Sequence, residues 1–473
     1  MTTRLPGRAD RWLVPGALVV TIVLVGLLWF GPLAPVAVVG AAVLVVLTVR
    51  VPQALVGLTL IVVVFSTPLQ AIAGGSASVA DDGLVLFCAI ALPARRLVVR
   101  GGLRWLPGSA WWLAFLAFGL ISAVAQDVPN GLALKGAFAA VKGVLFAFAV
   151  AQVDWPPGLV RRALLLTLPI TAITVFSGAV NLIAPAAWSH IVAGVSTVGP
   201  FGLPALVGPF GRPAAFSRFC GVLAVGALAY MLLVRRRPVV MAVFVSCTAL
   251  AFLTLQVKSL LGLLLTTALL CLPFLTRRRA LLVAMLVPAV LLPAAPVVWE
   301  LASTDFTAYV VQDSARSELT VGGLAVAAAT FPLGAGFGRY ASSTAADAYS
   351  PWYYWLHFDS RYGLAPGPDS GQFLNDSQWP ALYGETGWFG AACFVLGLVC
   401  LVVALLRGWH SETEPLWRWL RLAGLGWLAL LLAESAAAPV FVSAPSYPFV
   451  FLAAALLTGA QRAPARVQVP HAR

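Results

Sequence analysis

The sequence has 473 residues, of which 61% are hydrophobic and only 10% are charged, and its mean hydropathy is +0.94. A soluble globular domain does not have this composition. The net charge of +13 would be compatible with nucleic-acid binding, but the distribution of the charges along the chain gives it another explanation. The composition therefore predicts a membrane protein.

Apolar segments of about 18–22 residues recur along the whole chain, and each is long enough to cross a bilayer as an α-helix. In chain order the fourteen segments are 13–30, 33–49, 54–72, 82–99, 109–125, 131–152, 163–184, 213–234, 238–255, 259–275, 280–298, 385–406, 418–438 and 444–460. The first follows three arginines, as in a signal peptide, but it has no clear cleavage site and we expect it to be retained. The predicted fold is all-α, a polytopic bundle of about 14 transmembrane helices.

The basic and acidic residues fall in alternate linkers between these segments. With the N-terminus placed in the cytoplasm, 22 of the 27 arginines lie on the cytoplasmic side and 13 of the 17 acidic residues lie on the other side. Cytoplasmic loops of membrane proteins carry such an excess of basic residues. The positive charge therefore indicates topology, and nucleic acid is not an expected partner. We predict a multi-pass protein of a bacterial plasma membrane with both termini in the cytoplasm.

One long polar segment interrupts the apolar series and divides the chain. The predicted parts are transmembrane helices 1–11 over residues 1–299, an extracytoplasmic loop over 300–384, transmembrane helices 12–14 over 385–461, and a disordered basic tail over 462–473. A loop of this size on one face of a membrane protein is the expected place for binding or catalysis.

The long loop is expected to have two parts. Residues 314–340 predict an amphipathic helix that ends at a glycine-rich turn, with Leu319, Leu324, Val326 and Ala327 as its apolar positions. The remainder, rich in Tyr, Trp, Pro and Gly, predicts a lid. Its aromatic run 352–355 is compatible with either an interfacial belt or a stacking surface for sugars.

The six cysteines all lie in apolar segments, and no CxxC pair occurs. This arrangement indicates neither a disulfide framework nor a zinc site. We expect these thiols to pack as small core residues. No metal and no cofactor is expected.

A few cations depart from the cytoplasmic bias. Arg212, Lys258 and Arg316 are predicted on the outer face, although they come from separate parts of the chain. If they converge they would bind an anion such as a lipid diphosphate, because Arg forms paired contacts with phosphate and Lys supplies a point charge.

Other cations have simpler alternatives. Arg218 could pair with Glu434, and Arg339 could be a solvated loop charge. Lys142 is predicted near the middle of the membrane, where a charge is expensive and marks a functional site unless it is paired. Lys135 lies two turns before it on the same face and could reach the outer interface.

Three residues of the outer loop are candidates for a general base. Asp376 and Glu385 lie where the loop returns to the membrane, and His357 lies in its aromatic part. A carboxylate or imidazole within hydrogen-bond reach of a hydroxyl can take its proton. Asp81 and Asp82 begin the predicted fourth span, where the helix dipole also favours acids.

Four stretches resemble, in the same order, motifs of the O-antigen ligase and Wzy-type polysaccharide polymerase superfamily. They are ADDGLVLFCAIALPARR, GPFGRPAAFSRFCGVLA, TLQVKSLLGLLL, and RSELTVGGLAVAAATFPLGAGFGRY followed by DSQWPALYGETGWFGAACF. The last pair is similar to the pattern R…P-x-G-x-G-x-G…H-N-x-x-L…E-x-G-x-x-G. These motifs cover about a fifth of the chain, and their order around one large loop is the specific part of the resemblance.

Two departures from the family pattern bear on function. Asp376-Ser377 stands where ligases have a His-Asn pair, and Lys258 replaces the usual Arg. The first departure favours a polymerase over a ligase and leaves the identity of the base open. The second weakens a paired contact to phosphate.

The resemblance implies metal-independent glycosyltransfer at the outer membrane face, from a glycan carried on a polyprenyl diphosphate to a glycan or lipid acceptor. On this interpretation the substrate-binding residues are Arg212, Arg218, Lys258, Arg316, Arg339 and Lys142. The candidate catalytic residues, in order of preference, are Asp376, Glu385 and His357. Membrane lipids, a flippase and a chain-length regulator are the further partners implied.

Four alternatives remain open from the sequence. One is ligase-like transfer of a finished glycan to a lipid or protein. Another is a flippase or transporter of lipid-linked glycans, although the two halves of the chain are unlike. A third is a transferase that uses Asp81 and Asp82, and the fourth is a structural membrane subunit.

Overall fold

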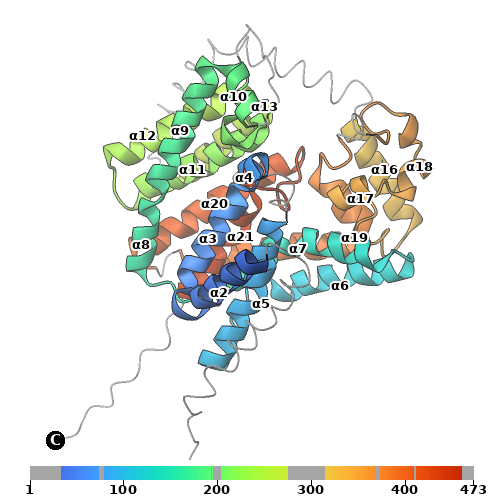
Figure 1. The fold of residues 1–473 in the computed structure, drawn as a ribbon, viewed down its shortest axis with the longest axis horizontal. Coiled ribbons are helices and arrows are strands. Elements are labelled where there is room, and N and C mark those ends of the chain that lie inside the picture. Colours follow the sequence, from blue (N-terminus) through green and yellow to red (C-terminus); the bar gives the residue numbers. More distant parts are fainter. Residues whose placement is uncertain are drawn as a thin grey trace, which may run out of the picture.

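The computed structural model describes residues 34–73, 79–192, 194, 204–274, 315–367, 373–409 and 412–460. The predicted segments 13–30 and 280–298, loop residues 300–314 and the tail 462–473 lie outside the described residues. The described part is helical throughout its regular elements, which confirms the all-α class (Figure 1).

The first helices follow the apolar segments of the sequence. They are α2 (Ala34–Arg50), α3 (Pro52–Val64), α4 (Ser66–Ala73), α5 (Ala80–Arg100), α6 (Ser109–Ala125) and α7 (Asn130–Ala151). The predicted segment 54–72 is divided at Phe65, between α3 and α4. α5 ends at Gly101, whose φ of 71° lets its N–H bond back to the carbonyl of Leu97.

Prolines begin four helices of the middle region. This region contains α8 (Pro157–Leu165), α9 (Thr167–Ile183), α10 (Pro185–Ile191), η4 (Gly208–Phe210), α11 (Pro213–Leu233), α12 (Pro238–Leu253), α13 (Val257–Cys271) and η5 (Leu272–Phe274). Proline suits a first helical turn because the missing N–H would have no partner there. The predicted segment 163–184 is divided at Leu166, between α8 and α9.

The described part of the long loop folds into what we call the loop module, residues 315–367. It contains α16 (Ala315–Ala329), α17 (Ser343–Asp347), α18 (Pro351–Trp355) and η7 (Phe358–Ser360). The predicted amphipathic helix is present as α16, which buries Leu319, Val326 and Ala327. Leu324 was assigned to the same face wrongly, since it is 41% exposed. The module has its own apolar cluster around Tyr340, Tyr353 and Phe358.

The last three helices are α19 (Gln378–Arg407), α20 (Pro415–Ser435) and α21 (Tyr447–Ala460). α19 begins seven residues before the predicted start at Glu385, because Pro380 is tolerated within its first turn. Glu385 therefore lies inside the helix. The helical path breaks at Gly387, where φ is 65° and ψ is −175°.

α20 and α21 lie at the centre of the molecule. α20 packs against α11, α13 and α21, while α21 also packs against α7. α19 packs against α6 and α16. Figure 1 shows α9 to α13 on one side and the loop module on the other, with α20 and α21 between them. The loop that joins α20 to α21 therefore has access to both sides.

Six described segments are long and apolar enough to cross a membrane. They are Asn130–Ala151, Pro157–Ile183, Pro213–Leu233, Val257–Phe274, Gln378–Arg407 and Pro415–Ser435. Large apolar side chains are also exposed on several helices, such as Ile121, Val124 and Ile183, which are 55%, 78% and 83% exposed. Apolar side chains on the exterior are stable against lipid but not against water. These features indicate a helical membrane protein.

Candidate functional site

Residues 436–446, the α20–α21 loop, receive contacts from three distant parts of the chain. Lys258 Nζ, at the start of α13, donates to the carbonyl of Ala437 at 2.9 Å. Arg218 Nη1, in α11, lies 3.5 Å from Ser443 Oγ. Ser377 Oγ, just before α19, donates to the carbonyl of Ala436 at 3.2 Å. The loop therefore brings together α11, α13 and the segment that leads into α19.

Two ion pairs lie beside this loop. Arg316 Nε, in α16, donates to Asp376 Oδ2 at 2.8 Å, and its Nη2 contacts the same oxygen. Arg218 Nε lies 3.5 Å from Glu434 Oε2, which confirms the pairing expected from the sequence. Both pairs join residues that are far apart in the chain.

The remaining cations complete the group. Lys258 lies within electrostatic range of Arg316, Asp376, Arg218 and Glu434. Arg212, which precedes the first turn of α11, lies within electrostatic range of Arg218. The cation cluster, as we define it, contains four cations and two carboxylates: Arg212, Arg218, Lys258, Arg316, Asp376 and Glu434. Its formal charge is therefore +2.

The cation cluster extends from the interior to the surface. The side chain of Glu434 is 0% exposed and that of Arg218 is 9% exposed. Arg316 and Asp376 are 19% and 28% exposed, and Arg212 is exposed. An anion arriving from outside would therefore meet Arg212, Arg316 and Asp376 before the buried members.

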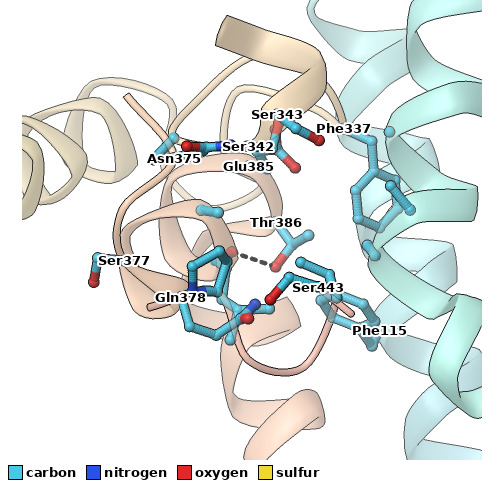
Figure 2. Close-up of a pocket in the computed structure, with 18 residues that line it drawn as sticks. Phe115, Phe337, Ser342, Ser343, Asn375, Ser377, Gln378, Glu385, Thr386 and Ser443 are labelled. Carbon is cyan, nitrogen blue, oxygen red and sulfur yellow. Dashed lines mark hydrogen bonds between the residues drawn. The ribbon is translucent and has the colours of Figure 1, made fainter. Parts of the chain in front are cut away.

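A cavity of about 110 Å³ adjoins the cation cluster. Asn375 and Ser377, on either side of Asp376, line it, and so does Ser443, which contacts Arg218. Figure 2 shows Ser342, Asn375 and Glu385 toward one end, Gln378 and Ser443 toward the other, and the rings of Phe115 and Phe337 along one side. The lining therefore combines hydroxyl and amide groups with aromatic rings.

Glu385 holds the glycine turn, residues 334–338, in place. Its Oε1 accepts hydrogen bonds from the N–H of Gly338 at 2.9 Å, from the N–H of Tyr340 at 3.2 Å and from Ser342 Oγ at 2.6 Å. The backbone carbonyl of Glu385 accepts from Gly336 at 2.8 Å. The residue is 3% exposed and also lines the cavity. Glu385 therefore has a structural role in one wall of the cavity, independent of any catalytic role.

The glycines of this turn are required by close backbone approach. Gly334 and Gly336 have φ values of 86° and 89°, which disfavour other residues. A Cβ on Gly334 would lie 2.3 Å from the nitrogen of Gly387, where α19 breaks. A Cβ on Gly136 of α7 would lie 2.5 Å from the nitrogen of Gly338. The turn is therefore packed directly between α7 and α19.

Other sequence candidates lie apart from the cation cluster. Lys142 is paired with Asp82 at 3.0 Å and lies over the ring of Tyr447, 5.2 Å from its centroid. His357 is exposed at the end of α18, and its described contacts stay within the loop module. Arg339 is half-buried, immediately after the glycine turn. Lys142 and His357 are therefore not brought together with Lys258 and Arg316.

Sequence reasoning missed the α20–α21 loop and the polar residues of the cavity, Asn375, Gln378 and Ser443. The sequence APSYP after Ser443 places small polar residues between two apolar segments, and this pattern could have drawn attention to the loop. Among the described residues, no group of three or more His, Cys, Asp or Glu side chains could hold a metal ion.

No protein-family profile matches this sequence, and a search of curated proteins finds no significant sequence match. The helices define the class as a helical membrane protein. The features that bear on function are the cation cluster and the cavity.

Proposed function

We propose that this protein is a glycosyltransferase of the membrane surface. It transfers a glycan from a polyprenyl diphosphate donor to a sugar hydroxyl, and so polymerises lipid-linked oligosaccharide units. The observation that carries this proposal is the convergence of Arg218, Lys258 and Arg316 on two carboxylates beside the cavity, with Arg212 near Arg218.

The charge of the cation cluster suits a diphosphate. Three cations lie near two carboxylates and Arg212 lies near Arg218, so the cation cluster has a positive excess of two. A diphosphate leaving group gains negative charge as its bond to the sugar breaks, and cations already in position stabilise that charge. The guanidinium groups supply paired contacts to phosphate oxygens, while Lys258 supplies a point charge.

The cavity suits a sugar. Its hydroxyl and amide groups, including Ser342, Gln378 and Ser443, can donate to and accept from sugar hydroxyls. The rings of Phe115 and Phe337 offer apolar surface to the C–H faces of a sugar. Such a combination of apolar walls with a few placed polar groups is typical of small-molecule sites.

The reaction needs no group beyond substrate and side chains. The acceptor oxygen forms a bond to the anomeric carbon, while the bond from that carbon to the diphosphate oxygen breaks. The electron pair leaves with the diphosphate, and the acceptor proton passes to a base. Asp376 is the first candidate because its neighbours Asn375 and Ser377 line the cavity.

The pair between Arg316 and Asp376 gives this base a means of activation. In the structure Asp376 Oδ2 accepts from Arg316. A bound diphosphate competes for the same guanidinium, and the carboxylate it releases is free to accept a proton. Glu385, which also lines the cavity, is the second candidate, although one of its oxygens already accepts three hydrogen bonds. His357 remains the third.

The membrane setting belongs to the same proposal. We infer fourteen spans in a bacterial plasma membrane, with both termini in the cytoplasm and the loop module outside. The six segments described above support a membrane location. Outside the membrane no nucleoside triphosphate is available, so a donor that arrives already activated on a lipid diphosphate fits this side.

The proposal is tested with the full chain in proteoliposomes that contain a polyprenyl-diphosphate-linked oligosaccharide. The measurements are glycan length by mass spectrometry and release of polyprenyl diphosphate. We expect Arg316→Ala to lower the rate about 100- to 1,000-fold, as loss of one preorganised charge does elsewhere. Arg361→Ala is the matched control. Arg361 pairs at 3.4 Å with Glu318, which lies in α16 as Arg316 does, and Arg361 lies outside the cation cluster.

Three outcomes would contradict the proposal. Equal loss in both variants would show that the effect comes from α16 as a whole. Unchanged glycan length in Arg316→Ala would remove the role of the cation cluster. Movement of a fluorescent lipid-linked glycan across the bilayer without bond formation would indicate a transporter.

A further inference from the structure

A second group of arginines lies in the C-terminal part of α5 and in the linker that follows it, and the proposed transfer reaction does not use it. Asp154, between α7 and α8, interacts with three guanidinium groups. Arg104 Nη2 lies 2.8 Å from Asp154 Oδ1, and Arg100 Nη2 lies 3.2 Å from Oδ2. Arg96 Nη1 lies 3.7 Å from Oδ1. We call these four residues the arginine cluster.

The linker that follows α5 is fixed to the C-terminal end of α7. The N–H of Arg104 donates to Gln152 Oε1 at 3.0 Å, and Gln152 Nε2 donates back to the carbonyl of Arg104 at 2.8 Å. The guanidinium of Arg104 also donates to the carbonyl of Val153 at 3.3 Å. Gln152 is only 2% exposed. The position of Arg104 is therefore set before any ligand arrives.

The arginine cluster carries more positive charge than it neutralises. Burial alone would raise the pKa of Asp154, but the hydrogen bond and charge of Arg104, together with Arg100, lower it below its usual value. Asp154 is therefore a carboxylate at neutral pH and contributes one negative charge. Three guanidinium groups against one carboxylate leave an excess of two positive charges. Arg100 is 60% exposed and can reach an external anion.

Apolar surface lies directly beside these arginines. Leu97, Val98 and Val99, in the last turn of α5, are 48%, 57% and 58% exposed. Trp105, one residue after Arg104, is 59% exposed and packs against Phe148, with ring centroids 5.6 Å apart. Exposed tryptophan between apolar and basic side chains is typical of the boundary between acyl chains and headgroups. An anion that also carries acyl chains would match both the arginines and this apolar surface.

We propose that Arg100, supported by Arg96 and Arg104, binds the phosphate of an anionic phospholipid headgroup at this end of the helices. Arg100 makes the direct contact because it is the most exposed of the three. The acyl chains lie against Leu97, Val98, Val99 and Trp105. The site is independent of the proposed transfer reaction.

The test uses the full chain in nanodiscs of phosphatidylcholine with increasing phosphatidylglycerol. Native mass spectrometry counts the phosphatidylglycerol retained, and thermal unfolding reports the stabilisation. We expect Arg100→Gln to weaken retention about five-fold, because one basic residue near an anionic surface contributes about that factor. Arg100→Lys keeps the charge and should restore most of the retention.

Arg50→Gln is the matched control, because Arg50 is also exposed and also ends an apolar helix, α2. It should leave retention unchanged. Equal losses in Arg50→Gln and Arg100→Gln would show a general effect of net charge and would overturn the site. Retention that is unchanged in Arg100→Gln would also overturn it. Inorganic phosphate added to phosphatidylcholine nanodiscs should not stabilise the protein, and stabilisation equal to that by phosphatidylglycerol would refute a lipid ligand.

Discussion

Lys142 lies in the predicted segment 131–152, and Lys258 lies in the predicted outer turn between segments 238–255 and 259–275. The two lysines are stabilised in different ways. Lys142 has its own carboxylate, Asp82, at 3.0 Å, and it also lies over the ring of Tyr447. Lys258 donates to a backbone carbonyl, that of Ala437, and shares the carboxylates Glu434 and Asp376 with arginines. The first lysine lies near two carboxylates, Asp82 and Asp81, and the second belongs to a group with a positive excess.

From this difference we expect charge balance to be a better guide to function than depth in the membrane. From the sequence alone Lys142 was the more conspicuous residue, because it falls near the middle of a span. A cation with a dedicated carboxylate needs no ligand to be stable there. A group with excess positive charge gains stability when an anion binds, so Lys258 is the stronger candidate for substrate contact.

The largest expected effect is a difference in transfer activity between substitutions of the two lysines. Lys258→Gln should lower glycan transfer in the proteoliposome assay about 100- to 1,000-fold, because it removes a charge that stabilises the leaving diphosphate. Lys142→Gln should keep the rate within about ten-fold, once normalised to folded protein. If Lys142→Gln is as damaging as Lys258→Gln while remaining equally stable, the distinction by charge balance fails.

The next largest effect concerns Glu385, a carboxylate that already accepts three hydrogen bonds. Glu385→Ala should lower the free energy of unfolding by about 3 kcal/mol, because buried donors of Gly338, Tyr340 and Ser342 lose their acceptor. Denaturation in detergent measures this loss. Glu385→Gln keeps an acceptor and should be milder. A Glu385→Gln protein of normal stability but no transfer would instead make Glu385 the base.

A smaller effect concerns the Lys142–Asp82 pair itself. Because the side chain of Asp82 is 42% exposed, we expect a coupling energy of about 1 kcal/mol in a double-mutant cycle with Lys142→Met and Asp82→Asn. Thermal unfolding of the four proteins in one detergent provides the measurement. A coupling near zero would mean that Tyr447 and solvent, rather than Asp82, stabilise this lysine.

The smallest effect is expected at the exposed pair of Lys135 and Asp347, whose side chains are 63% and 66% exposed. Lys135→Gln should change the free energy of unfolding by less than about 0.5 kcal/mol, as is usual for surface ion pairs. Transfer activity should be unaffected. A marked loss of activity would place α17 and this end of α7 in the substrate path.

The positions of the helices could be predicted from the sequence because hydropathy is a local property. The segments 109–125 and 131–152 match α6 and α7 to within one residue. The breaks at Phe65 and Leu166 could not be predicted, since hydropathy continues across them. The start of α19 was missed because Pro380 and Gly384 precede Glu385, although both lie within the helix.

The candidate site was only partly predictable. The outer cations stood out against a basic bias toward the other side, and the Arg218–Glu434 pair could be anticipated from charge alone. Contacts between distant residues, such as Lys258 with Ala437 or Phe441 with Gln378, depend on how the helices pack. No local pattern encodes them. The role of Glu385 in holding the glycine turn was hidden for the same reason.

The cation cluster draws its members from both sides of the molecule. Arg316 comes from the loop module, whereas Arg218 and Lys258 come from α11 and α13. A diphosphate bound to all three would act as a reversible crosslink between these sides. Because a ligand that prefers the folded state raises the midpoint of thermal unfolding, the same contact would make stability a direct readout of occupancy.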